Sequence, residues 1–452
     1  MNRVRALSSA HVKRISPQTL TRTQTRIYAR GGHTRPVCWG GTTVGSYYAG
    51  AVEFNLHDRD VVADPFPAFR RLREDDPAHW SENLNGWILT RYDDVRDALS
   101  LSVDRIIPFL EHQSRDALDA FGDLRLIALW SSFNDQPMHT HLRRIMGKAL
   151  TVGYTAGAEP MIRRIVAGLI GQFDGRDEID LMADFAYRLP IGVMGTLLGL
   201  PASDHERLRV WSDEVNLFVG GAKGQSDKYP RAARGVADMT EYFRDTVAAR
   251  RAAPGDDLVS RLVWATDEGD AMTDDEVVAT CVMLTYAGHV TTAHLLGNGV
   301  LALLRHPVQL ARLRAEPSRI PAAVEEVFRY DGPVQAMVRI ADRSFELHGR
   351  TIARGDRIFP MLNAANRDPA VFDDPEVFDV LRPDNRHIVF GHGIHTCIGL
   401  QLARLEIPIA FEALLDRVAG IAGPPEWIDS VAFRGPARLP VAIRREGVPP
   451  CD

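Results

Sequence analysis

The residue best suited to bind a metal lies in a glycine-rich segment near the C-terminal end of the chain. Residues 390–399 read Phe-Gly-His-Gly-Ile-His-Thr-Cys-Ile-Gly, and an apolar helical pattern starts at Leu400. Cys397 therefore comes where an irregular loop meets a helix start, and the unpaired amides and dipole there stabilise a thiolate. A single cysteine is more often a small buried residue than a ligand, so the prediction of a metal ligand depends on the whole pattern.

Two other groups of polar residues have helical spacing. His139 and Arg143 stand four residues apart within an amphipathic pattern, and Glu326 and Arg329 stand three apart, so each pair shares a helix face. Acid–base pairs at this spacing are also common on solvated helices, and an exposed basic turn is the simpler interpretation of His139 and Arg143. Spacing alone leaves both interpretations open.

The longest uncharged stretch covers residues 277–304, which contain no Asp, Glu, Lys or Arg. Its length exceeds the ~20 residues of a membrane span. The stretch also contains threonines, histidines and an asparagine, which hydrocarbon tolerates poorly. A capping box at 273–276 and a stop at His306-Pro307 favour one helix of about 32 residues through the core of a soluble domain.

Composition excludes several classes of protein. The 53 Lys and Arg and 59 Asp and Glu give a net charge of −6, which offers no basic surface of the kind that binds nucleic acid. The four cysteines are too scattered for a disulfide framework or a zinc site. A makeup of 45% hydrophobic and 25% charged residues is that of a globular protein, here mainly helical with a minor β part.

The first 50 residues differ from the rest, with eight basic residues and no acidic one. We expect residues 1–51 to form a disordered basic extension, or to reflect an over-long translation start; a transit peptide is the alternative. Residues 52–452 are expected to form one large domain.

The segment 390–399 resembles the haem-binding loop of the cytochrome P450 family, whose pattern is F-x-x-G-x-[HR]-x-C-x-G. The resemblance implies haem b as the cofactor and Cys397 as the thiolate ligand of its iron. It also implies that Phe390 packs near the sulfur and that His395 contacts a haem propionate. Gly391 and Gly399 are expected to let the backbone lie close against the flat cofactor.

Four further segments match the family in its order. Glu326 and Arg329 resemble its E-x-x-R motif, with Arg382 as the third member of a structural cluster, and residues 364–369 resemble the meander before the haem loop. The other matches concern the cofactor and oxygen, and they imply propionate contacts from His139, Arg143 and Arg339 and an oxygen-binding helix segment at Ala287, Gly288, Thr291 and Thr292.

Val290 departs from the family pattern, which places Asp or Glu before the oxygen-side threonine for proton delivery. A general acid needs a titratable group, and valine has none. We therefore expect protons to arrive through water held by Thr291 and Thr292, or by another side chain. His289 and His294 are expected to satisfy local hydrogen bonds.

The resemblance, from about Val52 to Val441, predicts a cytochrome P450 fold with a C-terminal hairpin at 434–441. It implies a soluble, cytoplasmic monooxygenase that takes electrons from a separate ferredoxin or flavodoxin with its reductase and inserts one oxygen atom of O2 into an apolar small molecule by hydroxylation or epoxidation. A bacterial secondary metabolite such as a polyketide or terpene is the expected substrate. Its pocket is expected to be lined by the loop after Arg105, the helix face near Met283 and Ala287, and residues 334–337 and 431–433. Oxidative coupling, desaturation or redox-neutral rearrangement is an alternative, and a non-catalytic binding protein is a third.

Overall fold

The computed structural model of the chain describes residues 54–111, 122–221 and 227–444, all within the unit Ala51–Asp452. The predicted basic extension 1–51 lies outside the described residues, as do Cys38 and Cys451. The predictions for them remain predictions.

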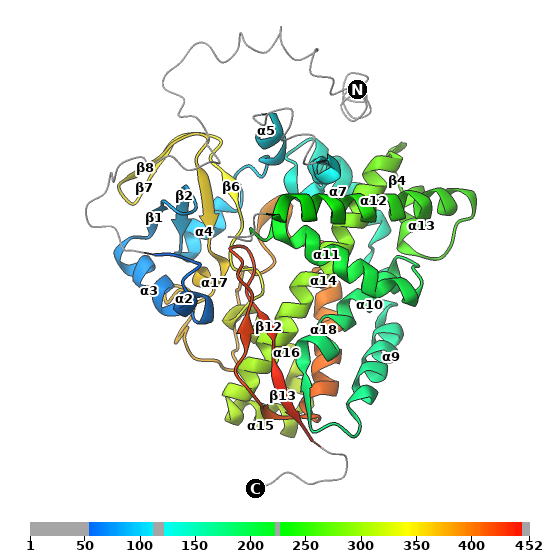
Figure 1. The fold of residues 1–452 in the computed structure, drawn as a ribbon. Coiled ribbons are helices and arrows are strands. Elements are labelled where there is room, and N and C mark those ends of the chain that lie inside the picture. The colour runs from blue at the N-terminus through cyan, green and yellow to red at the C-terminus, as the bar shows by residue number, and fades with distance from the viewer. Residues whose placement is uncertain (1–53, 112–121, 222–226, 445–452) are drawn as a thin grey trace. The chain divides into compact units, whose positions relative to one another are not determined.

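Helices form most of the described structure (Figure 1). The α-helices are α2 (Arg59–Ala63), α3 (Phe66–Asp75), α4 (Tyr92–Ala98), α5 (Ile106–Glu111), α7 (Met138–Ala149), α8 (Val152–Ala156), α9 (Glu159–Ile170), α10 (Arg188–Leu197), α11 (His205–Val219), α12 (Lys228–Ala252), α13 (Leu258–Trp264), α14 (Asp274–Arg305), α15 (Pro307–Ala315), α16 (Ile320–Tyr330), α17 (Leu362–Ala365) and α18 (Leu400–Leu415). Short 3-10 turns are η1 (Gly122–Leu129), η2 (Ser131–Phe133), η3 (Gly171–Phe173), η5 (Ala202–Asp204), η6 (Pro317–Arg319) and η7 (Gly393–His395), and η4 (Met182–Ala186) is a π-helical turn.

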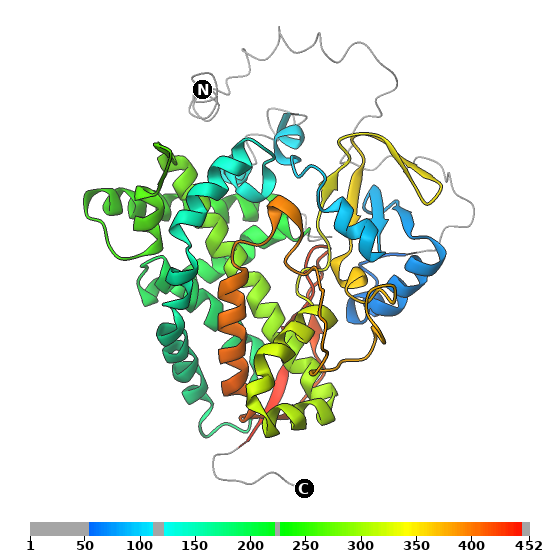
Figure 2. The ribbon, with the colours of Figure 1, turned by 180° about the vertical axis from the view of Figure 1, so that it is seen from behind.

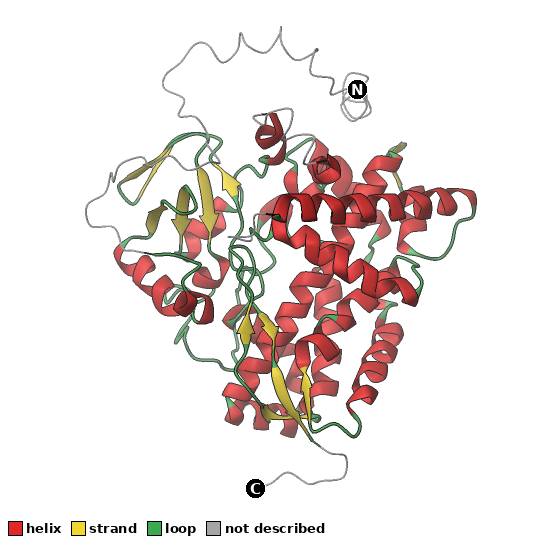
Figure 3. Ribbon diagram, viewed as in Figure 1, coloured by secondary structure: helices red, strands yellow, loops and turns green. Residues whose placement is uncertain are grey.

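The strands form small sheets, of which the largest lies to one side of the helical part (Figure 3). They are β1 (Ala78–Ser81), β2 (Gly86–Leu89), β3 (Glu178–Asp180), β4 (Thr266–Asp267), β5 (Asp270–Ala271), β6 (Arg339–Ile340), β7 (Phe345–Leu347), β8 (Arg350–Ile352), β9 (Arg357–Pro360), β10 (Val418–Ile421), β11 (Glu426–Trp427), β12 (Pro436–Arg438) and β13 (Pro440–Ile443). The largest sheet has the order β1-β2-β9-β6, in which only β2 and β9 run parallel. The predicted mainly α class with a minor β part is confirmed.

Helix α14 begins and ends where its sequence predicts. The side chain of Thr273 accepts a hydrogen bond from the backbone N–H of Glu276, and the Glu276 carboxylate accepts one from the backbone N–H of Thr273 at 2.8 Å, which completes the capping box. Nearly all of its 32 residues are buried against other protein elements. Of the helices described, none combines the length and apolar character needed to cross a bilayer.

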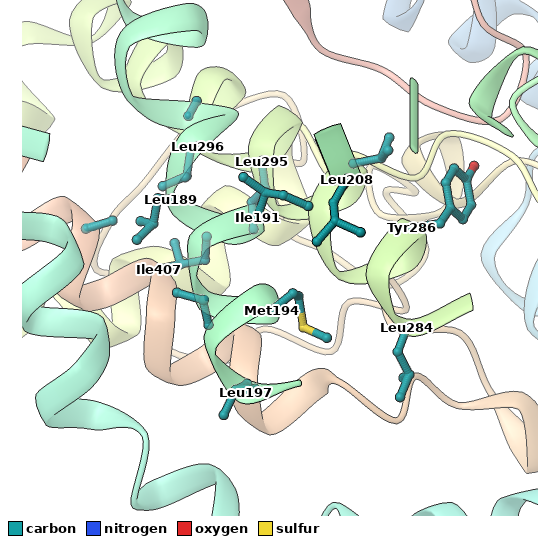
Figure 4. Close-up of a cluster of buried hydrophobic side chains, with 14 of the residues drawn as sticks. Leu189, Ile191, Met194, Leu197, Leu208, Leu284, Tyr286, Leu295, Leu296 and Ile407 are labelled. Carbon is teal, nitrogen blue, oxygen red and sulfur yellow. The ribbon is translucent and has the colours of Figure 1, made fainter. Parts of the chain in front are cut away.

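The main hydrophobic core surrounds α14. Side chains of α10, α11, α14 and α18 meet in it, among them Leu189, Met194, Leu208, Leu295 and Ile407 (Figure 4). Helix α18 also packs against α9 and α16 (Figure 2). Because α18 follows the cysteine loop directly, this packing fixes the position of the loop relative to α14.

The prediction of a hairpin at 434–441 is wrong in detail. Strand β12 pairs with β11, with Glu426 opposite Arg438, so the hairpin is β11–β12 and its loop contains residues 428–435. Strand β13 belongs to another sheet, between β10 and β3. Pro440 cannot donate a ladder hydrogen bond, and the chain changes sheet there.

Candidate active site

Cys397 closes a tight loop immediately before α18. Its backbone N–H donates to the carbonyl of Phe390 at 2.9 Å. Gly391 and Gly393 have φ angles of +77° and +73°, a conformation that glycine adopts at no steric cost. Gly399 has an ordinary φ of −85°, and a Cβ there would lie 3.8 Å from the sulfur of Cys397. The prediction that Cys397 lies between a glycine-rich loop and a helix start is confirmed.

The thiol of Cys397 lies in a recess of the protein. Solvent reaches the residue, yet desolvation by the surrounding protein raises the pKa of its thiol. The backbone N–H of Gly399 and the guanidinium of Arg143 lower that pKa, as expected of a loop at a helix start beside a cation. Desolvation is the largest of these effects, so the loop alone does not make the thiol acidic. A metal ion would, because it deprotonates a coordinating thiol outright.

Helix α7 brings two of the predicted residues to the cysteine loop. The ring centroids of His139 and His395 lie 4.2 Å apart, and Nη2 of Arg143 donates to the carbonyl of Thr396 at 2.5 Å. Within the described part of the chain, both ring nitrogens of His139 and Nε2 of His395 are buried without a hydrogen-bond partner. Such groups are costly unless a partner binds them. Desolvation lowers both histidine pKa values, that of His395 to about 4, so both rings are neutral at pH 7.

Two guanidinium groups lie nearby, of which Arg339 is buried and Arg105 half-buried. Arg339 donates to the carbonyls of Leu99 and Val338 at 3.1 and 3.0 Å, and Arg105 donates to the Val338 carbonyl at 3.4 Å. Desolvation, and then repulsion by Arg339, lowers the pKa of Arg105 to about 9; desolvation also lowers that of Arg339 to about 10, against the attraction of Asp135. Both cations would gain from additional negative charge.

These donors fit the cofactor that the resemblance implies. Its carboxylates would supply acceptors to side chains that carry positive charge or an unpartnered N–H, namely Arg105, His139, Arg143, Arg339 and His395. Asp135 is the carboxylate that acts on several of them, and its Oδ1 lies 4.0 Å from Nε2 of His395, beyond hydrogen-bond distance. We name the five donor residues Arg105, His139, Arg143, Arg339 and His395 the carboxylate-binding cluster.

Helix α14 is buried over nearly its whole length except at one short face. From Glu276 to Leu303, every residue is buried except Ala287, Gly288 and Thr291. These three share one side of the helix, because their spacings of one and four residues place them next to each other. This open face of α14 is where the sequence predicts the oxygen-side residues, although the fourth predicted residue, Thr292, is buried outside it.

Two residues of this face, Thr291 and Gly288, make contacts that bear on the roles expected of them. The hydroxyl of Thr291 donates to the carbonyl of Ala287 at 2.8 Å, so the hydroxyl oxygen can still accept a proton or a hydrogen bond from another group. A Cβ on Gly288 would lie 2.8 Å from the side chain of Met194. Helix α14 continues as regular α-helix through Gly288. The structure therefore shows a packing role for this glycine.

The E-x-x-R motif forms a buried ion cluster. Arg329 donates to both carboxylate oxygens of Glu326, at 2.7 and 2.8 Å, with side chains 0% and 1% exposed. Nε of Arg382 lies 3.1 Å from Oε2 of Glu326 and Nδ2 of Asn385 donates to the same oxygen at 3.0 Å. Arg329 also donates to the carbonyl of Asn366 within the meander. The predicted cluster of Glu326, Arg329 and Arg382 is confirmed, and Asn385 joins it.

The expectation that His289 and His294 satisfy local hydrogen bonds is wrong for His289. Among the described residues, neither ring nitrogen of His289 nor Nδ1 of His294 has a partner, although all three atoms are buried. Both rings are buried, and desolvation lowers the pKa of His289 to about 3 and that of His294 to about 4. Val290 lies between them on the buried side of α14.

The structure brings together part of the predicted substrate lining. Val334 and Phe433 form an isolated β-bridge, as do Ala336 and Met361, so segments 334–337 and 431–433 lie side by side. The loop after Arg105 was also predicted to line the pocket, but residues 112–121 lie outside the described part.

Sequence reasoning missed Arg105, which belongs to the carboxylate-binding cluster, and Asp135, the acid that attracts its members Arg339 and His395. Arg105 reaches Arg339 because Ser102 forms a β-bridge with Ile340, more than 200 residues further along the chain. No local pattern encodes that pairing.

Comparison with known proteins identifies the family. The profile of the family described as Cytochrome P450 matches residues 231–418. Over 401 residues the chain is 37% identical to the cytochrome P450 monooxygenase PikC of Streptomyces venezuelae, which covers 86% of this chain and 93% of that protein. It is 34% identical over 406 residues to the polyketide biosynthesis cytochrome P450 PksS of Bacillus subtilis, covering 87% of this chain and 99% of that one.

A solved structure agrees with these relatives. P450BioI in complex with an acyl carrier protein ligated to hexadec-9Z-enoic acid superposes with a TM-score of 0.79 at 32% identity, covering 85% of this chain and 99% of that one. The chain belongs to the cytochrome P450 family, and it has the fold that the sequence predicts. It is a monooxygenase of the type found in bacteria, with haem b as its cofactor, a small-molecule substrate and a redox partner.

Proposed function

We propose that this enzyme inserts one oxygen atom of O2 into a C–H or C=C bond of an apolar small molecule, at a haem whose iron Cys397 ligates. The observation that carries the proposal is the carboxylate-binding cluster beside the Cys397 loop. Buried donors without acceptors are rare in folded proteins, and here they gather next to a thiol in a recess.

The residues that would hold the haem come from three parts of the chain. Cys397 would bind the iron, and the cluster residues Arg143 and Arg339 with His139 and His395 would bind the propionates. Phe390, whose ring lies 4.8 Å from that of Phe328, would hold the loop against the core. Gly391 and Gly399 would let the loop lie close to the cofactor.

When bound, the haem activates dioxygen with two electrons from the redox partner. The chain contributes position and proton flow. Thr291 lies on the open face of α14 with Ala287 and Gly288, and its hydroxyl oxygen can accept a hydrogen bond from water while its hydrogen donates to the Ala287 carbonyl. To pass a proton on, the hydroxyl must rotate so that this hydrogen leaves the Ala287 carbonyl and points to the next acceptor. Thr292 is buried beside it, where it can order the helix but has less access to solvent.

The substrate class and the partners are inferred from the lining residues and from the relatives. The described lining segments are apolar, with Val334, Ala336 and Phe433 among them, which favours an apolar substrate. Relatives include an enzyme named for polyketide biosynthesis, which favours a secondary metabolite. A ferredoxin or flavodoxin with its reductase remains the proposed electron source, and a cytoplasmic location stays a prediction.

Val290 favours a second candidate function, oxidation without oxygen insertion, such as coupling or desaturation. Without a carboxylate at position 290, proton delivery on α14 depends on groups outside the motif. The two functions differ in the product: insertion adds one oxygen atom derived from O2, and desaturation or coupling adds none.

The test is a ligand screen followed by isotope labelling. Apolar compounds are titrated against the holoenzyme, and those that shift the haem spectrum are incubated with NADPH, a ferredoxin or flavodoxin, the reductase and 18O2. We expect one 18O atom in the product. Products that lack 18O would favour the second candidate, and the absence of any product with both electron carriers would contradict the proposed electron source.

A further inference from the structure

A cavity of 230 Å³ lies beside α14 at Val290, the position where the family pattern lacks its acid. His294 follows Val290 by one helical turn and lines the same cavity. The remaining lining comes from the end of η4, from α11 and from the β11–β12 loop, through Tyr187, Asp213, Asn216 and Ile428. This volume holds several water molecules, since a water occupies about 30 Å³ in the liquid.

Asp213 is the one carboxylic acid among the described residues that line this cavity. Its Oδ2 accepts a hydrogen bond from Nη1 of Arg209 at 2.5 Å. Solvent reaches 46% of its side chain surface. The carboxyl group therefore contacts a cation and faces the cavity.

The groups around Asp213 set its protonation. Partial desolvation raises its pKa to about 6, and Glu206 and Glu214 on the same helix add repulsion, while the attraction of Arg209 and the 46% exposure of the side chain limit the rise. Tyr187 faces it from the start of α10, and desolvation raises the pKa of that phenol beyond the physiological range. From α14 the facing groups are His289 and His294, and from the β11–β12 loop the apolar Ile428.

The two histidines stay neutral at pH 7 because desolvation lowers their pKa values to about 3 and about 4. The centroid of the Tyr187 ring lies 5.9 Å from that of His294 and 6.0 Å from that of His289. Nδ1 of His294 is buried without a partner in the described structure. A neutral imidazole has one donor and one acceptor nitrogen, so it can hold a water molecule by a hydrogen bond without taking up the transferred proton.

We propose that Asp213 on α11 is the acid that replaces the missing carboxylate at Val290, and that it supplies protons to Thr291 through water in the cavity. His294 acts as a positioning residue for that water. This inference rests on the proposed function, since it assigns Thr291 to the oxygen side of a haem. Val290 forms part of the cavity wall, and Thr291 is the next residue along α14. Thr291 itself lies on the open face and does not line the cavity, so the proposal requires water that passes around Val290 to reach its hydroxyl.

The transfer balances in protons. The O–H bond of the Asp213 carboxyl breaks as a cavity water gains a proton, and each further water breaks one O–H bond and forms another. At Thr291 the hydroxyl turns its hydrogen from the Ala287 carbonyl to the next acceptor, gives that proton up and takes one from the neighbouring water. Asp213 then regains a proton from solvent, which reaches its side chain. The electrons come from the redox partner of the established reaction. A carboxyl with a pKa near the working pH suits both halves of this cycle.

The first experiment measures Asp213 itself. Infrared spectra of the holoenzyme are recorded across pH 4 to 8, and those of Asp213→Asn are subtracted. We expect a protonated-carboxyl band that disappears as pH rises, with a midpoint near 6. An ionised Asp213 throughout this range would overturn the proposal, whatever the enzyme activity.

The second experiment measures coupling of electrons to product. Asp213→Asn should raise the fraction of electrons recovered as hydrogen peroxide severalfold, and Asp213→Glu should restore most of the coupling. Val290→Asp placed in the Asp213→Asn enzyme should also restore it, because the new carboxylate would enter the same cavity. His294→Leu should raise peroxide less than Asp213→Asn and leave the infrared midpoint near its wild-type value.

Glu214→Gln is the matched control. Glu214 neighbours Asp213 and also pairs with an arginine, Arg231 at 2.6 and 2.8 Å, but it does not line the cavity. Coupling should stay close to the wild-type level in Glu214→Gln. Because this variant removes one negative charge that acts on Asp213, the infrared midpoint should move slightly down. If Asp213→Asn behaves like Glu214→Gln, the proposal is wrong while the haem assignment stands; a wild-type enzyme without a thiolate-type spectrum would instead reject the proposed function.

Discussion

Replacing Arg329 with methionine tests whether the buried ion cluster holds the haem-loop scaffold. Arg329 is 0% exposed and donates to Glu326 twice and to the carbonyls of Asn366, Pro375 and Val377 at 3.0, 2.8 and 3.0 Å. Methionine fills a similar length but donates nothing. The variant therefore leaves Glu326 with one cation, Arg382, in place of two, and removes the Arg329 donor from the carbonyls of Asn366 and Pro375. The Val377 carbonyl still accepts from Arg382 at 3.1 Å.

The expected loss of stability is large. Breaking a buried ion pair by removing one partner costs about 3 to 5 kcal/mol. Arg382 and Asn385 still donate to Glu326, and the backbone N–H of Asp379 donates to it at 2.9 Å, so we expect the lower half of that range, about 3 to 4 kcal/mol. Typical domains unfold with about 5 to 15 kcal/mol, so this is a substantial fraction.

Denaturant unfolding of the holoenzyme, followed by far-ultraviolet circular dichroism and by the haem absorbance, measures the effect. The control is Arg163→Met, because Arg163 pairs with Glu159 on a surface where the side chains are 50% and 46% exposed. Exposed pairs contribute about 0 to 1 kcal/mol. A loss in Arg329→Met no larger than in the control would refute the scaffold role.

Three other changes test separate features. Burial raises the pKa of Glu406 to about 8, so between pH 4.5 and 8 the folded state keeps a proton that the unfolded state loses. The free energy of unfolding should therefore fall as pH rises through this window, and Glu406→Gln should remove that slope. Parallel curves of unfolding free energy against pH for the two proteins would contradict this prediction. Gly299→Ala should destabilise by about 1 to 3 kcal/mol, because its Cβ would lie 2.4 Å from Phe411 and 2.8 Å from Val327; an unchanged melting temperature would show that these side chains move freely. A chain truncated to begin at Val52 should fold, bind haem and turn over as the full chain does, and lost haem incorporation would show that residues 1–51 support the domain.

Local signals explain what the sequence predicts well. The start and end of α14 follow from its capping box and from Pro307, which act within a few residues. The cysteine loop and the cluster of Glu326, Arg329 and Arg382 follow from ten-residue and three-residue patterns that resemble a known family. These features need no knowledge of which helices touch.

Contacts between distant segments explain what the sequence does not predict. Asp213 faces Val290 only because α11 packs against α14, and the strand that follows Leu439 enters a sheet with β3 and β10 that its own residues do not specify. The apolar alternation of such a short strand fits either partner. Whether a buried ring nitrogen such as those of His289 finds a hydrogen-bond partner also depends on how neighbouring helices pack around the ring.

The reduced, carbon monoxide-bound spectrum of Cys397→Ser tests the central claim most directly. The claim is that Cys397 ligates the haem iron as a thiolate, because serine cannot supply the sulfur donor that gives the thiolate-type band. The control is Cys281→Ala, since Cys281 is buried in α14 and the account assigns it no contact with haem. We predict that the band is lost in Cys397→Ser and kept in Cys281→Ala; a thiolate-type band in Cys397→Ser would contradict the account.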